Sequence, residues 1–133
     1  MCGRESTIVG PEGDAVVEAA REALGDRLRT VVEYDEDDYR ILYLSAWLRE
    51  HLGEDGVEDT SERLHSYVHL DFVERDLYTE LTPGAGAVQC HVTRLESAVF
   101  VRYLVGDAGL FLSVDTDTDL SVLCDAVDDA LDR

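Results

Sequence analysis

Between Val88 and Asp115, three runs of apolar and β-branched residues follow one another, separated only by short polar turns. The middle run, residues 98–105, is apolar in both alternating registers except at Arg102, and Gly106-Asp107 forms the turn after it. Tight turns join antiparallel strands, whereas parallel strands need a long crossover connection. This stretch therefore predicts an antiparallel meander of three strands.

The chain before the meander predicts one helix and one hairpin. Apolar residues recur at helical spacing from Ala15 to Leu24, and Gly25 is suited to end the helix in a left-handed conformation. Residues 28–34 and 39–44 are two β-rich runs on either side of an acidic turn. This pattern predicts a β-hairpin.

Helical segments are predicted between the hairpin and the meander, and again at the end of the chain. Gly53 and Gly56 should break a short helix over residues 45–52, and Asp59-Thr-Ser-Glu62 has the form of a capping box that starts the next helix. The residues of this second helix expected to face the core are Leu64, Tyr67, Val68, Phe72, Leu77 and Leu81. A last helix follows Asp119, with an apolar face made of Leu120, Leu123, Cys124, Val127 and Leu131.

The alternation within the strands predicts how the sheet is covered. Residues 39–44 and 98–105 are largely apolar in both registers, so both of their faces need cover. Val88, Cys90 and Val92 instead alternate with polar residues, as in an edge strand with one buried face. The sequence therefore predicts an α/β (α+β) fold, in which a five-stranded antiparallel sheet carries helices on both faces.

Length and composition fit one domain. With 133 residues, of which 45% are apolar, we expect a single domain over residues 11–133, preceded by a flexible leader of residues 1–10. The chain has no apolar run of about 18 residues that would span a membrane. The first residues lack the basic and apolar regions of a signal peptide, so we expect a cytoplasmic protein without membrane contact.

The element order over residues 14–132 resembles the roadblock/LC7 fold, which is a profilin-like three-layer architecture. The long region broken at Gly53 and Gly56 departs from that pattern. Roadblock-like proteins usually dimerise and act as platforms, so the resemblance implies a homodimer whose partner is a small GTPase or a regulatory assembly. Residues 25–29, 37–44 and 106–115 resemble a family of small acidic haloarchaeal proteins of unknown function.

The charge pattern points to the same source. The sequence has 30 acidic residues against 11 basic ones, a net charge of −19, and every basic residue is Arg. This composition resembles that of haloarchaeal proteins, whose acidic surfaces stay hydrated in molar salt, where the Debye length is about 3 Å. Nucleic-acid binding driven by counterion release needs clustered Lys and Arg. We therefore expect no direct contact with nucleic acid.

Val88, Cys90 and Val92 are the candidate interface residues. Natural edge strands are usually guarded by Lys, Pro or inward charges, whereas Arg94 is the only charged residue in the run before Leu95. An unguarded edge can pair with its own copy across a two-fold axis. The sequence thus predicts a homodimer joined at this strand.

Four tyrosines suggest a different function. Tyrosine combines an apolar body with a polar tip, so several on one sheet can line a small-molecule pocket. The same residues are equally explained as strand side chains that fill the space between sheet and helices. The candidates for such a sensing module are Tyr34, Tyr39, Tyr43 and Tyr103.

Catalytic and metal sites are weakly indicated. Removal of Met1 would give Cys2 a free α-amine as its own base, and Met-Cys-Gly-Arg resembles the start of SRAP-domain proteins and of N-terminal-nucleophile amidotransferases, which are longer proteins. His65 and His69 have the spacing of a zinc pair but lack an HExxH motif. We therefore expect a non-enzymatic binding module with no catalytic residues, no metal and no cofactor.

Overall fold

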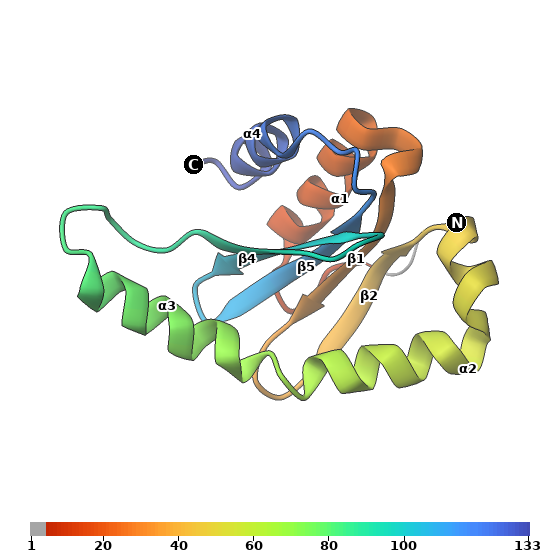
Figure 1. The fold of residues 1–133 in the computed structure, drawn as a ribbon, viewed down its shortest axis with the longest axis horizontal. Coiled ribbons are helices and arrows are strands. Elements are labelled where there is room, and N and C mark those ends of the chain that lie inside the picture. Colours follow the sequence, from red (N-terminus) through yellow and green to blue (C-terminus); the bar gives the residue numbers. More distant parts are fainter. Residues whose placement is uncertain (1–4) are drawn as a thin grey trace.

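The computed structural model describes residues 5–133 (Figure 1). Within that part of the chain a short 3₁₀ turn, Gly25–Arg27, connects the first helix to the first strand. The helices are α1 (Pro11–Leu24), α2 (Ala46–His65), α3 (His69–Leu81) and α4 (Leu120–Ala130). The strands are β1 (Leu28–Tyr34), β2 (Tyr39–Leu44), β3 (Cys90–Arg94), β4 (Val99–Val105) and β5 (Ala108–Val114).

The five strands form one antiparallel sheet in the order β2-β1-β5-β4-β3. Helices α1 and α4 lie side by side on one face, and α2 and α3 run across the other (Figure 1). The predicted fold class, the hairpin, the meander and the position of the third strand at an edge are confirmed. None of the described helices is both long and apolar enough to cross a membrane.

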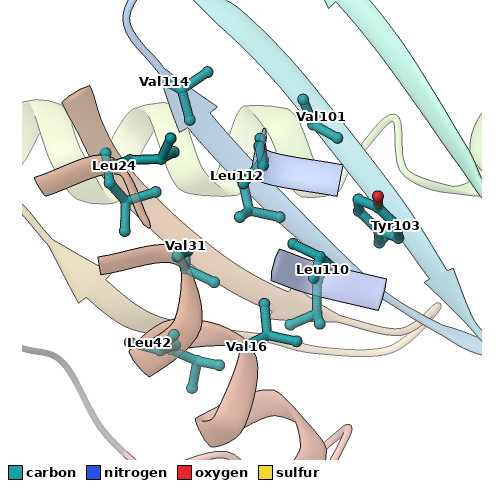
Figure 2. Packing of buried hydrophobic residues seen from close by; sticks show 14 of the residues in the cluster. Val16, Leu24, Val31, Leu42, Val101, Tyr103, Leu110, Leu112 and Val114 are labelled. Atoms are coloured by element: carbon teal, nitrogen blue, oxygen red, sulfur yellow. The ribbon is translucent and has the colours of Figure 1, made fainter. Parts of the chain in front are cut away.

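The main core lies between the sheet and the α1–α4 layer (Figure 2). Val16 of α1 and Leu123 of α4 are fully buried there against Leu112 of the central strand β5. As expected from alternation, β4 divides its side chains: Val101 belongs to this core, while Phe100 packs on the opposite face. The apolar stripes predicted for the first and last helices therefore both pack into this core.

Helix α2 agrees with the prediction at Gly53 and differs from it at Gly56. Ser45 caps its first part, since its hydroxyl accepts a hydrogen bond from the Leu48 N–H at 3.1 Å. Gly53 has a non-helical conformation (φ 71°, ψ 166°), so two helical segments meet there, as the sequence predicts, whereas Gly56 lies within the second segment. The expected capping box at Asp59 is wrong, because Asp59 lies inside the helix and pairs with Arg63, 3.8 Å away. A capping sequence and an i,i+4 ion pair use the same residue types.

The α2–α3 layer covers the sheet much less tightly than the α1–α4 layer. Helix α2 buries none of its side chains, and α3 buries only Asp71 and Phe72. A second, smaller cluster forms around Phe72, with Tyr34, Leu104 and Phe111 from the sheet. One face of the molecule is thus well packed, and the other keeps both space and exposed apolar surface.

Residues 6–9, which the sequence places in a leader, contact strand β1. The backbone N–H groups of Thr7, Ile8 and Val9 donate to the carboxylate of Glu33, at 2.8, 3.1 and 2.9 Å. Glu33 is fully buried, so these bonds replace the water that its charge has lost. Cys2, the candidate N-terminal nucleophile, lies outside the described residues.

Candidate functional site

The outer edge of β3 presents unpaired backbone groups. In an antiparallel pair, the residues that exchange hydrogen bonds alternate with residues whose N–H and C=O point to the other side. The Leu104 N–H donates to the Gln89 carbonyl (2.9 Å) and the Leu95 N–H to the Ala98 carbonyl (2.8 Å), so the odd-numbered residues of this segment bond to β4. The backbone groups of Cys90, Val92 and Arg94 therefore point away from the sheet. No other strand among residues 5–133 pairs with them.

Helix α3 adds an exposed apolar face. Leu70, Leu77 and Leu81 recur at helical spacing, and Leu81 is 64% exposed. Tyr67 and Tyr78 are also exposed, at 65% and 49%. The prediction that Tyr67, Leu77 and Leu81 face the core is wrong. Periodicity finds the apolar face of a helix, but it does not say whether that face meets the sheet or the surface.

The exposed α3 face and the β3 edge share a groove of about 430 Å³. Leu70 and Tyr78 line it from α3, and Tyr67 lines it from the turn before that helix. Val92, which is 48% exposed, lines it from β3. Polar groups form the rest of its wall, from Asp71, Glu74, His91, Thr93 and Arg102. Apolar contact surface and free strand hydrogen bonds therefore lie side by side.

A buried polar network holds α3 on the sheet beside this groove. The Tyr34 hydroxyl donates to Asp71 Oδ2 (2.7 Å), and Arg102 Nε lies 3.1 Å from Asp71 Oδ1. His91 Nε2 is 3.0 Å from the Asp71 carbonyl oxygen. Burial first, and then the charge of Asp71, raise the pKa of Tyr34 far above its usual value, so its hydroxyl stays a donor. The network fixes the position of α3 relative to the β3 edge.

The three candidate interface residues have different surroundings. Val88 is half-buried against the cluster around Phe72, and Cys90 packs toward α4. Burial raises the pKa of the Cys90 thiol, and Cys124 beside it raises it further. Only Val92 exposes its side chain. Period-two alternation does not extend to Val88, because β3 begins at Cys90.

A family model described as "Domain of unknown function (DUF7522)" matches residues 14–132. The chain belongs to this family. No curated protein matches it.

Solved structures share the fold of this DUF7522 chain at low sequence identity. Myxococcus xanthus MglB is 15% identical, with a TM-score of 0.60, over 97% of this chain and 93% of that one. The Roadblock/LC7 domain from Streptomyces avermitilis is 13% identical, with a TM-score of 0.56, over 86% and 90%. The gliding protein MglB from Thermus thermophilus is 18% identical, with a TM-score of 0.54, over 96% and 91%. The roadblock/LC7-like fold expected from element order is confirmed.

The four candidate tyrosines of this DUF7522 domain do not meet in one pocket. Tyr34 and Tyr39 line a cavity beneath α2. Tyr43 and Tyr103 pack on the other face, with the α1–α4 core. Tyr39 and Tyr43 are four residues apart in β2, but a register shift in the β1–β2 pairing between them reverses the alternation. The alternation of side chains along a regular strand therefore could not assign Tyr39 and Tyr43 to the correct faces of the sheet.

The histidine pair does not form a metal site in the described part of the domain. His65 Nε2 is 2.9 Å from the Asp35 carbonyl oxygen, and His69 is exposed at the start of α3. Across residues 5–133, no three His, Cys, Asp or Glu side chains come together to hold an ion. In the acidic turn, Asp35 Oδ1 accepts hydrogen bonds from the N–H groups of Asp37 and Asp38, which makes it a turn-forming residue.

Proposed function

We propose that this protein is a non-enzymatic scaffold that works as a homodimer joined at the β3 edge. The observation that carries the proposal is the row of outward backbone groups at Cys90, Val92 and Arg94, next to the exposed apolar face of α3. An exposed edge of this kind pairs with another strand unless it is guarded. Pairing with a second copy extends the sheet across a two-fold axis.

The alternation is compatible with a simple register for this pairing, which we propose. With Val92 opposite its own copy, Cys90 stands opposite Arg94 of the partner subunit, and all three outward-facing positions are used. Edge pairing alone buries little surface, and a stable interface needs about 1,000 Å² or more. The groove residues Tyr67, Leu70 and Tyr78 lie beside the edge and supply the apolar part of that area.

The dimer is proposed to act in the cytoplasm of a salt-loving archaeon. Two copies of a chain with net charge −19 repel each other in dilute buffer. At 1 M salt the Debye length is about 3 Å, so the repulsion between charges on the two subunits is screened except where they are in direct contact at the interface. The absence of Lys and the excess of acidic residues support this setting.

The partner proposed for the dimer is a small GTPase or a regulatory assembly built around one. Support comes from the likeness to roadblock and MglB structures, which is a likeness of fold. Small GTPases of a halophilic host, loaded with GDP or with a non-hydrolysable GTP analogue, should be titrated onto the protein in molar KCl. Saturable binding that depends on the nucleotide supports the platform role. Absence of binding to every GTPase of that host contradicts it.

A further inference from the structure

We propose that the cavity beneath α2 is a binding site for an uncharged aromatic molecule of one ring, or of indole size, that carries one hydrogen-bond donor. The cavity measures about 130 Å³ and lies between α2 and the sheet, where residues of β1, β2, β4 and β5 line it, and α3 contributes Asp71. Val32 and Ile41 form its floor, and Leu52, Val57 and Leu64 form its roof. The β3 edge is not part of this site, and the proposal does not depend on the GTPase partner.

The size and lining of the cavity select the ligand's shape. Protein interiors rarely keep voids much larger than a water molecule. An apolar cavity of about 150 Å³ stays dry and takes up benzene, so the space beneath α2 fits one aromatic ring. Phe100 and Phe111, whose rings are 4.9 Å apart, offer aromatic contacts on the sheet side. A ring here supplies the apolar packing that α2 lacks, since α2 buries none of its own side chains.

Polar groups at one end of the cavity select a hydrogen-bond donor. Tyr39 and His65 line the cavity together, with their rings 5.3 Å apart. His65 Nε2 faces the Asp35 carbonyl oxygen at 2.9 Å and must carry the proton in the neutral ring. Nδ1 of the same ring is then an acceptor. A phenolic hydroxyl or an indole N–H supplies the matching donor.

The charge around this end excludes anions. Tyr39 lies within the field of Glu62, Glu58 and Asp38. Burial first, and then these three carboxylates, raise the pKa of the Tyr39 hydroxyl, because each disfavours a second negative charge nearby. A carboxylate on the ligand meets the same repulsion. Two charged residues, Asp71 and Arg102, also line the cavity, but they pair with each other at 3.1 Å, so Arg102 is already neutralised by a carboxylate. Phenol and indole therefore fit the site, whereas benzoate does not.

Calorimetric titration of the full chain with phenol, benzene and benzoate in molar KCl tests the site. Phenol should bind in a one-to-one complex, and benzene about tenfold more weakly because it lacks the donor. Benzoate should not bind. Failure of phenol to bind, or benzoate binding as tightly as phenol, overturns the proposal.

A filling variant locates the binding. Ser61 faces the cavity from α2, so Ser61→Leu places its side chain in the ligand's space and should abolish phenol binding. Ser121→Leu makes the same change on an exposed position of α4 and should leave phenol affinity unchanged. If Ser61→Leu does not fold, Val57→Phe fills the cavity from the same helix. Unchanged phenol affinity in the folded filling variant overturns the proposed location.

Discussion

The buried carboxylate of Glu33 accepts a hydrogen bond from the Ser6 hydroxyl at 2.5 Å, 27 residues away in sequence. The same hydroxyl accepts from the Gly10 N–H at 2.9 Å, just before α1 begins. Ser6 therefore connects the segment before α1 to strand β1. Gly13 is required beside it, because a Cβ there would collide with the Ser6 side chain.

Replacing the charge of this carboxylate should destabilise the protein strongly. Glu33→Gln keeps the shape but removes the charge that strengthens four donated hydrogen bonds, and it turns an amide N–H₂ toward donors. We expect a loss of about 2–4 kcal/mol in the free energy of unfolding, measured by urea denaturation in molar KCl. Glu36→Gln, in the exposed turn, is the matched control and should change stability little. Equal effects of the two substitutions would contradict the account of Glu33.

The same carboxylate gives stability a defined pH dependence. Burial alone raises the pKa of Glu33, but the hydrogen bonds from Ser6, Val9, Thr7 and Ile8 outweigh burial, and the net pKa lies below the ordinary value of 4.5. A depressed pKa stabilises the fold above the unfolded-state value, and this contribution is lost as pH falls through the folded-state value. Wild type should therefore lose stability more steeply than Glu33→Gln below pH 4.5. Parallel curves would show that Glu33 does not titrate as described.

The two helical layers should contribute unequally to stability. Leu112→Ala removes a fully buried side chain of the central strand, with an expected cost of about 3–5 kcal/mol. Leu48→Ala makes the same chemical change on α2, where the side chain is half-buried above the cavity, and should cost about 1 kcal/mol. Chemical denaturation of both variants measures the difference. A larger cost for Leu48→Ala would mean that α2 packs more tightly than described.

Salt should control stability more than in an ordinary protein. With 30 acidic and 11 basic residues, the folded chain in dilute buffer is under strong self-repulsion. Thermal unfolding midpoints should rise steeply along a KCl series toward 1 M, where the Debye length falls to about 3 Å. A flat series would remove the physical basis of the proposed halophilic setting.

The strand pattern was readable from sequence because it depends on neighbours in the chain. Arg102 is the only polar residue of its apolar run, and the Gly106-Asp107 turn sets the β4–β5 register, with Val105 opposite Ala108. These local signals were enough to predict the meander and, together with the hairpin, the five strands of the sheet.

The candidate interface was harder to predict because it consists of an apolar helix face and a strand edge that remain exposed after the chain has folded. The apolar spacing of Leu77 and Leu81 is the same for a buried face as for an exposed one. Asp71 was missed because a single acidic residue among many gives no sign that it will be buried against Tyr34 and Arg102. To identify Val92 and not Val88 as an exposed interface residue, one must know where β3 begins and which of its residues hydrogen-bond to β4. Both are properties of the folded sheet.

Proline at one position of β3 separates the dimer interface from the monomer fold. The Val92 N–H points outward, so Val92→Pro removes a donor at the free edge and leaves the bonds to β4 in place. His91→Pro, one residue earlier, would instead remove a bond of the β3–β4 ladder. Val92→Thr keeps the N–H and the side-chain shape, and is the matched control.

The molar mass of these variants in molar KCl, measured by light scattering, tests the central claim most directly. Wild type and Val92→Thr should have a mass of about 30 kDa, which is two copies of the 14.8 kDa chain. Val92→Pro should have the monomer mass of 14.8 kDa, with the circular dichroism of a folded protein. A monomeric wild type, or a folded Val92→Pro that remains dimeric, would contradict a dimer joined at the β3 edge.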